Sequence, residues 1–137
     1  MEPKQVIVIR KDLNMRRGKQ IAQGCHASMK VFFDKCEKGW SQDEHAGEIG
    51  KYTFYYEYNS PWDLWLNGRF TKIVVSCDTE QELDELYRQA KENKLPCSLI
   101  IDAGLTEFNG IPTKTCIAIG PANPKDIDNI TKHLKLL

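Results

Sequence analysis

The sequence contains no apolar run long enough to cross a membrane. Its first apolar stretch, residues 6–9, is followed at once by Arg10, Lys11 and Asp12, whereas a spanning helix needs about 20 apolar residues. The stretch is also shorter than the apolar segment of a secretory signal peptide. We therefore expect no membrane partner and a cytoplasmic location.

Cysteines and histidines at metal-binding spacing are also absent. The sequence has five cysteines and three histidines, but no CxxC pair and no histidine placed near two cysteines as in a zinc finger. We therefore expect no metal ion, and we interpret the cysteines as reduced, mostly buried thiols of a cytosolic protein. The first loop lacks a GxGxxG arrangement, which argues against a dinucleotide-binding enzyme.

The chain has no excess of positive charge, since 19 Lys and Arg balance 19 Asp and Glu. This balance argues against general duplex binding, and we expect no DNA partner. The charge is uneven, however, because residues 1–30 contain seven basic side chains and two acidic ones. A local basic patch on a neutral protein favours a partner held at one end, such as a tRNA acceptor stem.

The predicted elements alternate between strands and helices. The 137 residues are enough for one domain with a buried core, so we expect a single domain over residues 1–137. Apolar and β-branched runs predict strands at residues 6–9, 70–77, 97–102 and 115–120. Helices are predicted from Lys19 to near Cys36, after the capping box of Thr79 and Glu82, and after Asn123.

This order of elements indicates an α/β fold. Helical connections make the first three strands parallel through right-handed crossovers and place helices on both faces of the sheet. The Asn109-Gly110 turn signal makes the fourth strand antiparallel to the third. We therefore predict a three-layer α/β/α domain with a four-stranded, mostly parallel mixed sheet.

The first predicted helix has two distinct faces. Its apolar stripe, which we expect to pack on the sheet, consists of Ile21, Cys25, Met29, Phe32 and Cys36. Its polar line, which is either a solvated face or one side of a site, consists of Lys19, Gln23, His26 and Lys30. Gly24 favours a site, because a glycine inside a helix costs about 1 kcal/mol relative to alanine and suggests that something approaches closely there.

Residues 37–68 interrupt the pattern with an irregular insertion that is acidic at first and then rich in Tyr and Trp. One interpretation is a lid whose aromatic rings stack on exposed bases of a tRNA end, at about 1–3 kcal/mol per base. The other is packing, over the sheet edge or in a dimer contact. We favour packing, because aromatic clusters usually bury their area.

The loop between the first strand and the first helix is a candidate anion site. Such a loop, at the carboxyl end of a strand and opening onto a helix, is where α/β proteins usually bind phosphates. Arg16, Arg17 and Lys19 supply positive charge, and Gly18 lets a ligand approach the backbone.

Three segments carry motifs in the same order along the chain. Residues 12–27 read DLNMRRGKQIAQGCHA, residues 98–106 read SLIIDAGLT, and residues 115–121 read TCIAIGP. They resemble DLKMGKGKxAAQCSHA, SLIxDAGxT and TVxGIGP of the class II peptidyl-tRNA hydrolase family, the archaeal and eukaryotic type. Two positions depart from it, since Arg16 replaces a glycine and Gly24-Cys25 replaces Cys-Ser.

The resemblance implies hydrolysis of the ester that joins a peptide to the terminal ribose of tRNA, with no metal or organic cofactor. Parallel strands and an antiparallel return would bring the matching residues to one edge of the sheet. The catalytic residues expected on this basis are Lys19, His26, Asp102, Thr106 and Thr115. Asp102 would orient or deprotonate water and Lys19 would stabilise the oxyanion or hold the terminal phosphate, while His26 would relay a proton or form a hydrogen bond.

The expected partner is peptidyl-tRNA, and the resemblance also suggests a homodimer. Substrate contacts are expected from Arg16, Arg17, Gly18, Gln23, Lys30 and Lys114. The alternative is a non-catalytic module that binds tRNA or a protein and uses the aromatic insertion as its interface. Presence of the whole Lys19, Asp102, Thr106 and Thr115 set counts against that alternative.

Overall fold

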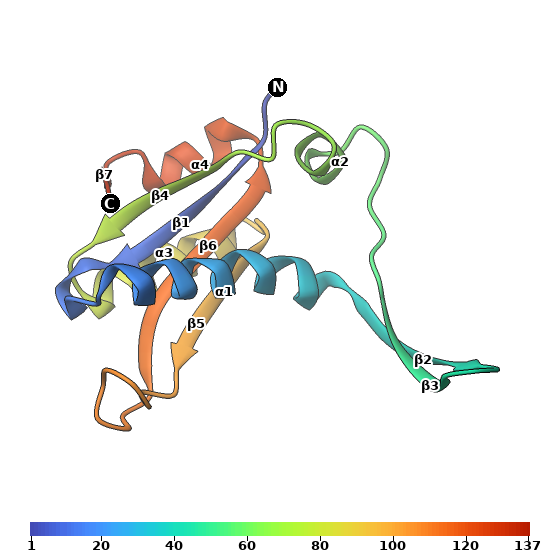
Figure 1. Ribbon diagram of the computed structural model, residues 1–137. Coiled ribbons are helices and arrows are strands. Elements are labelled where there is room, and N and C mark those ends of the chain that lie inside the picture. The colour runs from blue at the N-terminus through green and yellow to red at the C-terminus, as the bar shows by residue number, and fades with distance from the viewer.

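A five-stranded mixed sheet forms the centre of the computed structural model, which describes residues 1–137 (Figure 1). The strands lie in the order β5-β6-β1-β4-β7. They span Lys4–Arg10 (β1), Lys72–Cys77 (β4), Cys97–Asp102 (β5), Thr113–Ala122 (β6) and Lys135–Leu136 (β7). The prediction of an α/β fold around a mixed sheet is confirmed.

The sheet differs in two details from the predicted four-stranded, mostly parallel one. β1 pairs in parallel with β4, but β6 lies antiparallel between β1 and β5. The first three predicted strands therefore run in one direction, although only one neighbouring pair is parallel. The fifth strand, β7, is a two-residue segment on β4, too short to produce a periodic pattern in the sequence.

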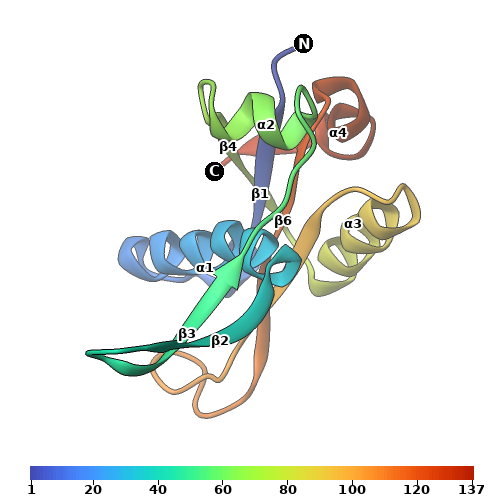
Figure 2. The same cartoon turned by 90° about the vertical axis from the view of Figure 1, so that its right-hand side faces the viewer.

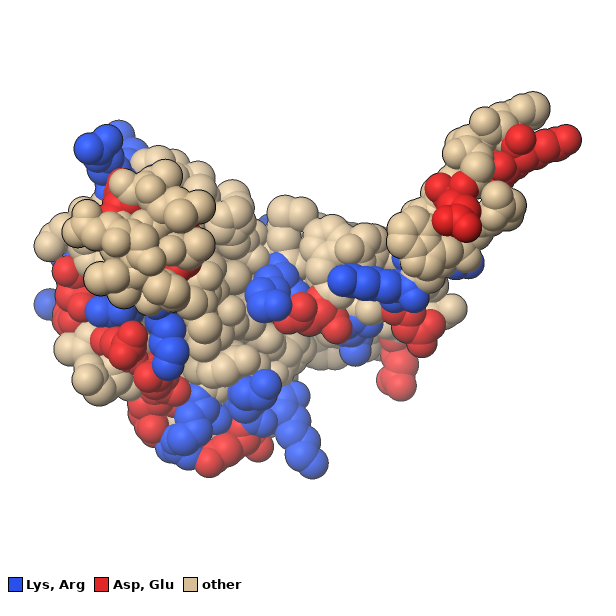
Figure 3. All heavy atoms as spheres, turned by 90° about the horizontal axis from the view of Figure 1, so that it is seen from below, with Lys and Arg blue, Asp and Glu red and all other residues tan.

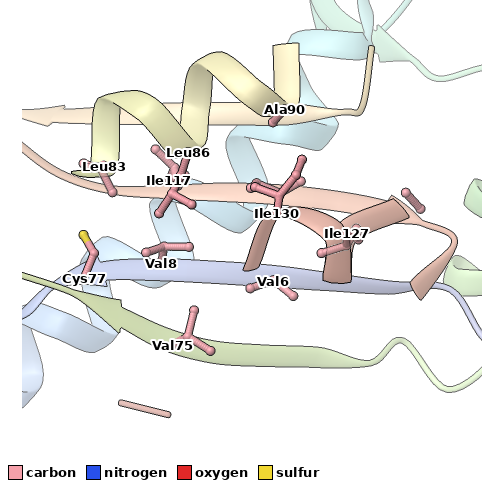
Figure 4. Packing of buried hydrophobic residues seen from close by; sticks show 12 residues of the cluster. Val6, Val8, Val75, Cys77, Leu83, Leu86, Ala90, Ile117, Ile127 and Ile130 are labelled. Carbon is pink, nitrogen blue, oxygen red and sulfur yellow. The ribbon is translucent and has the colours of Figure 1, made fainter. Parts of the chain in front are cut away.

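Side chains of β1 alternate between two cores, as the two-residue period of a strand requires. Val6 and Val8 point into a cluster with Leu83, Leu86 and helix residues further along the chain (Figure 4). Ile7 and Ile9 point to the opposite face and a second cluster. β1 is therefore buried on both sides.

Helices cover both faces of the sheet. α1 spans Arg17–Lys35, α3 spans Glu80–Glu92 and α4 spans Pro124–Thr131. Figure 2 shows α1 on one side and α3 and α4 on the other, which confirms the three layers. The predicted caps are present: the Thr79 hydroxyl accepts from the Glu82 N–H at 3.0 Å, and Asn123 caps α4.

The predicted packing face of α1 was wrong. Ile21 and Met29 are 61% and 56% exposed, whereas Gln23, Ala27 and Val31 are buried. The helix is turned because small side chains let it approach the sheet and because Gln23 finds polar partners there. Cys25 is exposed too, and Phe32 and Cys36 are only half-buried.

Part of the insertion expected to be irregular is a regular hairpin. Glu37–Asp43 (β2) and Gly47–Thr53 (β3) pair with each other alone. The hairpin, here called the arm, projects from the C-terminal end of α1 (Figure 1), and Figure 3 shows acidic side chains at its tip. None of its residues belongs to either buried cluster.

The rest of the insertion divides between buried and exposed rings. α2 spans Pro61–Leu66, and its Trp62 and Trp65 are buried in the cluster beneath α1, with Phe54 packed against them. Tyr55, Tyr56 and Tyr58 are exposed. The favoured packing interpretation therefore holds for α2, while the tyrosines before it lie on the surface.

No helix in the structure has the length and apolar character needed to span a membrane.

Candidate active site

An ammonium, a carboxylate and a hydroxyl meet where β5 ends. Lys19, in the first turns of α1, donates from Nζ to Asp102 Oδ1 and to Thr106 Oγ1, each at 3.0 Å. Asp102 is the last residue of β5, and Thr106 lies in the loop that leads to β6. The side chains of Lys19 and Asp102 are each 16% exposed, so the pair is shielded but still open to a ligand.

Gln23 supports this pair from the buried side. One helical turn after Lys19, its amide nitrogen donates to Asp102 Oδ1 at 3.2 Å. Its amide oxygen accepts a hydrogen bond from the Thr115 hydroxyl near the start of β6. Both Gln23 and Thr115 are fully buried. Thr115 therefore contacts Asp102 only through Gln23.

The surroundings favour the ionised form of Asp102. The hydrogen bond from the Lys19 ammonium lowers the pKa of the Asp102 carboxyl below its usual value, with smaller lowering effects from the Gly104 N–H and Gln23, while burial opposes them. The Gly104 N–H donates to Asp102 Oδ2 at 2.9 Å. Asp102 is therefore a carboxylate at neutral pH.

The Asp102 carboxylate and the Lys19 ammonium each keep hydrogen-bonding capacity that a ligand can use. Asp102 Oδ1 already accepts two hydrogen bonds, from Lys19 and Gln23, while Oδ2 accepts one. Since each carboxylate oxygen can accept about two, Oδ2 retains room for one donor, such as water. The Lys19 ammonium has three N–H groups and uses two of them. One acceptor and one donor thus lie side by side.

Other predicted residues lie near this group but do not join it. His26 is exposed and forms no hydrogen bond with Lys19, Asp102 or either threonine. The Arg16 side chain is 91% exposed and lies 3.9 Å from Glu107. Gly18 is exposed and has open space around it.

Arg17, Lys30 and Lys114 point elsewhere. Arg17 lines a groove on the other side of α1, beside β4. Lys30 is paired with Asp34 at 3.1 Å. The Lys114 side chain binds Asp84 of α3 at 3.0 Å, on the face of the sheet opposite Thr115, because neighbouring strand residues point to opposite faces.

The comparisons with known proteins agree with this geometry. A family model described as Peptidyl-tRNA hydrolase PTH2 matches residues 3–137. The chain belongs to this family. The family expected from the three motifs is thereby confirmed.

Named relatives in the family match over nearly their whole length. The Peptidyl-tRNA hydrolase of Methanocaldococcus jannaschii is 40% identical over 98% of this chain and 99% of its own. That of Methanopyrus kandleri is 39% identical over 98% and 97%. A solved structure of a protein of unknown function from Agrobacterium tumefaciens strain C58 has a TM-score of 0.57 and 14% identity, covering 100% of this chain and 98% of its own. At that identity the likeness concerns the fold alone.

Sequence reasoning missed three contributions to the site of this PTH2 family member. Gln23 was predicted as a substrate-binding residue, but its bridge between Asp102 and Thr115 was not predicted. The available signal was its place on the polar line with Lys19. Phe108 lies with its ring centre 5.8 Å from Lys19 Nζ, and the Gly104 N–H holds Asp102. The Phe108 contact has no pattern in the sequence, because it depends on how the loop folds. Gly104 does have a signal, since it lies in the SLIIDAGLT motif two residues after Asp102.

No three His, Cys, Asp or Glu residues lie close enough together to hold a metal ion.

Burial raises the pKa of the Cys116 thiol to about 12, and its sulfur donates to the Gln23 carbonyl at 3.2 Å. Cys116 is therefore a structural neighbour of Gln23 and not a nucleophile.

Proposed function

We propose that this chain hydrolyses the ester bond between a peptide and the terminal ribose of tRNA, releasing free tRNA and the peptide. The observation that carries the proposal is the contact of Lys19 with Asp102 and Thr106 at an accessible sheet edge. Family membership and the names of relatives that match over nearly the whole chain support the same reaction.

In the proposed mechanism, water binds the free position on Asp102 Oδ2 and attacks the ester carbonyl carbon. The third N–H of Lys19 donates to the oxyanion that forms, a contribution of about 3–4 kcal/mol in comparable sites. Collapse of the tetrahedral intermediate breaks the bond to the ribose oxygen, which takes up the proton that water loses. Because its pKa is lowered, Asp102 acts mainly by orienting water.

The RNA is proposed to approach over the N-terminal end of α1. Arg16 and Gly18 lie exposed there, and the free N–H groups of the first helical turn attract anions. His26 is assigned a contact with the bound RNA. Arg17, Lys30 and Lys114 make smaller contributions in this proposal, since the first faces a different groove and the others are paired with acids.

Substitution of Lys19 and Asp102 tests the reaction. Lys19→Met and Asp102→Asn are each expected to lower kcat/KM for peptidyl-tRNA by at least about 100-fold, the effect of removing one oxyanion donor or its partner. The matched control is Lys125→Met on α4. Unchanged rates in both variants would remove the proposed roles. A wild-type chain that binds tRNA but leaves the ester intact would be the non-catalytic module instead.

We also propose that two copies pair through the exposed side of α1. The apolar stripe of α1 that includes Ile21 and Met29 does not pack on the sheet. It lines an open groove of about 710 Å³ between α1 and β4. Its exposed apolar lining consists of Ile21, Met29, Phe70, Val74 and Leu137. Soluble monomers rarely expose a large contiguous apolar patch, which supports a second copy as its cover.

Sedimentation equilibrium tests the homodimer. The wild type is expected to have twice the chain mass, and the double variant Ile21→Glu with Met29→Glu is expected to have the mass of one chain, because buried charges oppose association. Tyr58→Glu, which adds the same charge at an exposed side chain outside the groove, is the control. A monomeric wild type would contradict the pairing.

A cytoplasmic location is part of the proposal, supported by five cysteines without a disulfide.

A further inference from the structure

A second hollow lies at the opposite end of β5 from Asp102. It has a volume of about 430 Å³ and is lined by the C-terminal parts of α1 and α3, the start of β5, and Trp62 of α2. Three lysines line it, and we call it the lysine cleft: Lys35, Lys91 and Lys94. None of the residues in the active-site group described above belongs to it.

None of the three lysines of the cleft forms an ion pair with an acid. Lys35, Lys91 and Lys94 are exposed, and none has a carboxylate within 4.0 Å. Lys91 instead lies over the neutral ring of Tyr87. The acid in the cleft wall, Asp34, is bound to Lys30 at 3.1 Å and also interacts electrostatically, at longer range, with Lys91. The cleft therefore offers three cations to a polyanion.

Aromatic rings continue the surface on one side of the cleft. An adjoining hollow shares Lys35 and Trp62 and is also lined by Tyr55, Tyr56 and Glu57. Tyr55 is 68% exposed, so its ring is open to stacking. Lysines beside exposed aromatic rings are the combination that binds single-stranded and irregular RNA without regard to sequence. Glu57 is the one acid facing this hollow without a basic partner.

The cleft and the active-site group lie at the two ends of one edge strand. β5 is the outermost strand on its side of the sheet, starting at Cys97 in the cleft and ending at Asp102. At about 3.3 Å per residue the two ends are separated by about 17 Å. One RNA molecule much longer than this, such as a tRNA, can reach both ends, whereas a terminal nucleotide in the site cannot.

We propose that the lysine cleft binds backbone phosphates of the substrate tRNA beyond its terminal nucleotides. This rests on the function proposed above and adds a second, sequence-independent contact. Phosphate contacts by Lys position a nucleic acid and make its binding sensitive to salt. The arm is a poorer candidate for the same role, because Asp43, Glu44 and Glu48 near its tip would repel phosphates.

The experiment compares the wild type with the triple variant Lys35→Ala, Lys91→Ala and Lys94→Ala. A matched control is Lys125→Ala with Lys132→Ala, near the two ends of α4 and outside the lining of the cleft. Two substrates are used: full-length peptidyl-tRNA, and a CCA trinucleotide carrying the same N-acetylated aminoacyl ester. Equilibrium binding of uncharged tRNA is measured at several salt concentrations, and thermal unfolding checks the fold.

The triple variant is expected to raise KM for full-length peptidyl-tRNA by about 10-fold while leaving the trinucleotide ester unaffected. The slope of log affinity against log salt is expected to become shallower by about 2 to 3, since each lost phosphate contact removes about 0.9. Equal effects on both substrates, or none on either, would overturn the proposal. So would an equal loss of affinity for duplex DNA, which would indicate a general polyanion surface.

Failure of the proposed hydrolysis can be distinguished from failure of the lysine-cleft proposal. If the wild type hydrolyses neither substrate, the reaction assignment falls, but binding of uncharged tRNA still tests the cleft. Weaker, less salt-dependent binding by the triple variant would then support the cleft as an RNA contact. Unchanged binding would overturn it.

Discussion

At the scale of single residues, the direction of the hydrogen bonds around Gln23 favours the ionised form of Asp102, in addition to the larger effect of Lys19. The Thr115 hydroxyl donates to the Gln23 amide oxygen, so the amide nitrogen faces Asp102. That nitrogen can only donate, as can the Lys19 ammonium. Asp102 must therefore accept at Oδ1, which favours its ionised form. A buried glutamine in this position therefore holds the Asp102 carboxylate from the side away from solvent.

The pKa of Asp102 provides the first prediction at this scale. Lys19→Met removes the largest cause of the lowered pKa, so the carboxyl of the variant is expected to titrate at a higher pH than in the wild type. Carbon-13 NMR of the Asp102 carboxyl during a pH titration measures this. Lys125→Met serves as control, and identical Asp102 curves in wild type and Lys19→Met would contradict the pairing.

The same shift has a defined effect on stability. The folded-state pKa lies below the unfolded value of about 3.9, so ionised Asp102 stabilises the fold at pH values above that unfolded value. This stabilisation is lost as the pH falls through the folded pKa. Lys19→Met is therefore expected to flatten the dependence of the unfolding free energy on pH in this acidic range, as measured by urea denaturation.

At the scale of elements, α1 shows how far a helix pattern predicts a packing face. The start near Lys19 and the end near Cys36 were predicted within two residues of the observed bounds, because helix boundaries depend on local sequence. The buried face was not, because Ile21 and Met29 suggested apolar packing. The observed face contains Gln23 and Ala27, whose burial depends on polar partners on distant strands.

The loop from β5 to β6 is the element on which the position of Thr106 depends. Its Gly104 has a positive φ of +81°, and an added Cβ would lie 2.3 Å from the Ile111 carbonyl oxygen. Gly110 has a similar φ of +76° but open space around it. A side chain at Gly110 would cause backbone strain alone, whereas a side chain at Gly104 would cause backbone strain and a steric clash. Comparing the two positions therefore separates the two effects within one loop.

Gly104→Ala is expected to displace the loop, whereas Gly110→Ala is expected to cost only about 1–2 kcal/mol for the left-handed conformation. Since Gly104 also donates to Asp102, its variant should lose at least about 10-fold in kcat, and Gly110→Ala should keep most of its activity. Urea denaturation and turnover of peptidyl-tRNA measure both. Equal losses in the two variants would show that loop position does not control the site.

At the scale of the whole molecule, the body was predictable and the arm was not. Strands of the body alternate in burial or are buried on both faces, and helices connect the first three of them. Among the strands of the body, only β7 and the pairing of β6 with β1 were missed. The meeting of Lys19 with Asp102 followed from that topology. β2 and β3 are exposed along nearly their whole length, so no periodic burial marks them in the sequence.

Removal of the arm is expected to leave the body intact. Lys38 pairs with Tyr52, so residues 39–51 can be replaced by Asn-Gly, which closes two antiparallel strands in a tight turn. Because no arm residue belongs to a buried cluster, the unfolding free energy should change by less than about 1 kcal/mol, and hydrolysis should persist. Trp62→Ala, buried in α2, should instead cost about 3–5 kcal/mol. The shortened chain keeps Tyr52, which packs on Phe33 of α1, so a loss in urea denaturation as large as that of Trp62→Ala would mean that residues 39–51 themselves support the core.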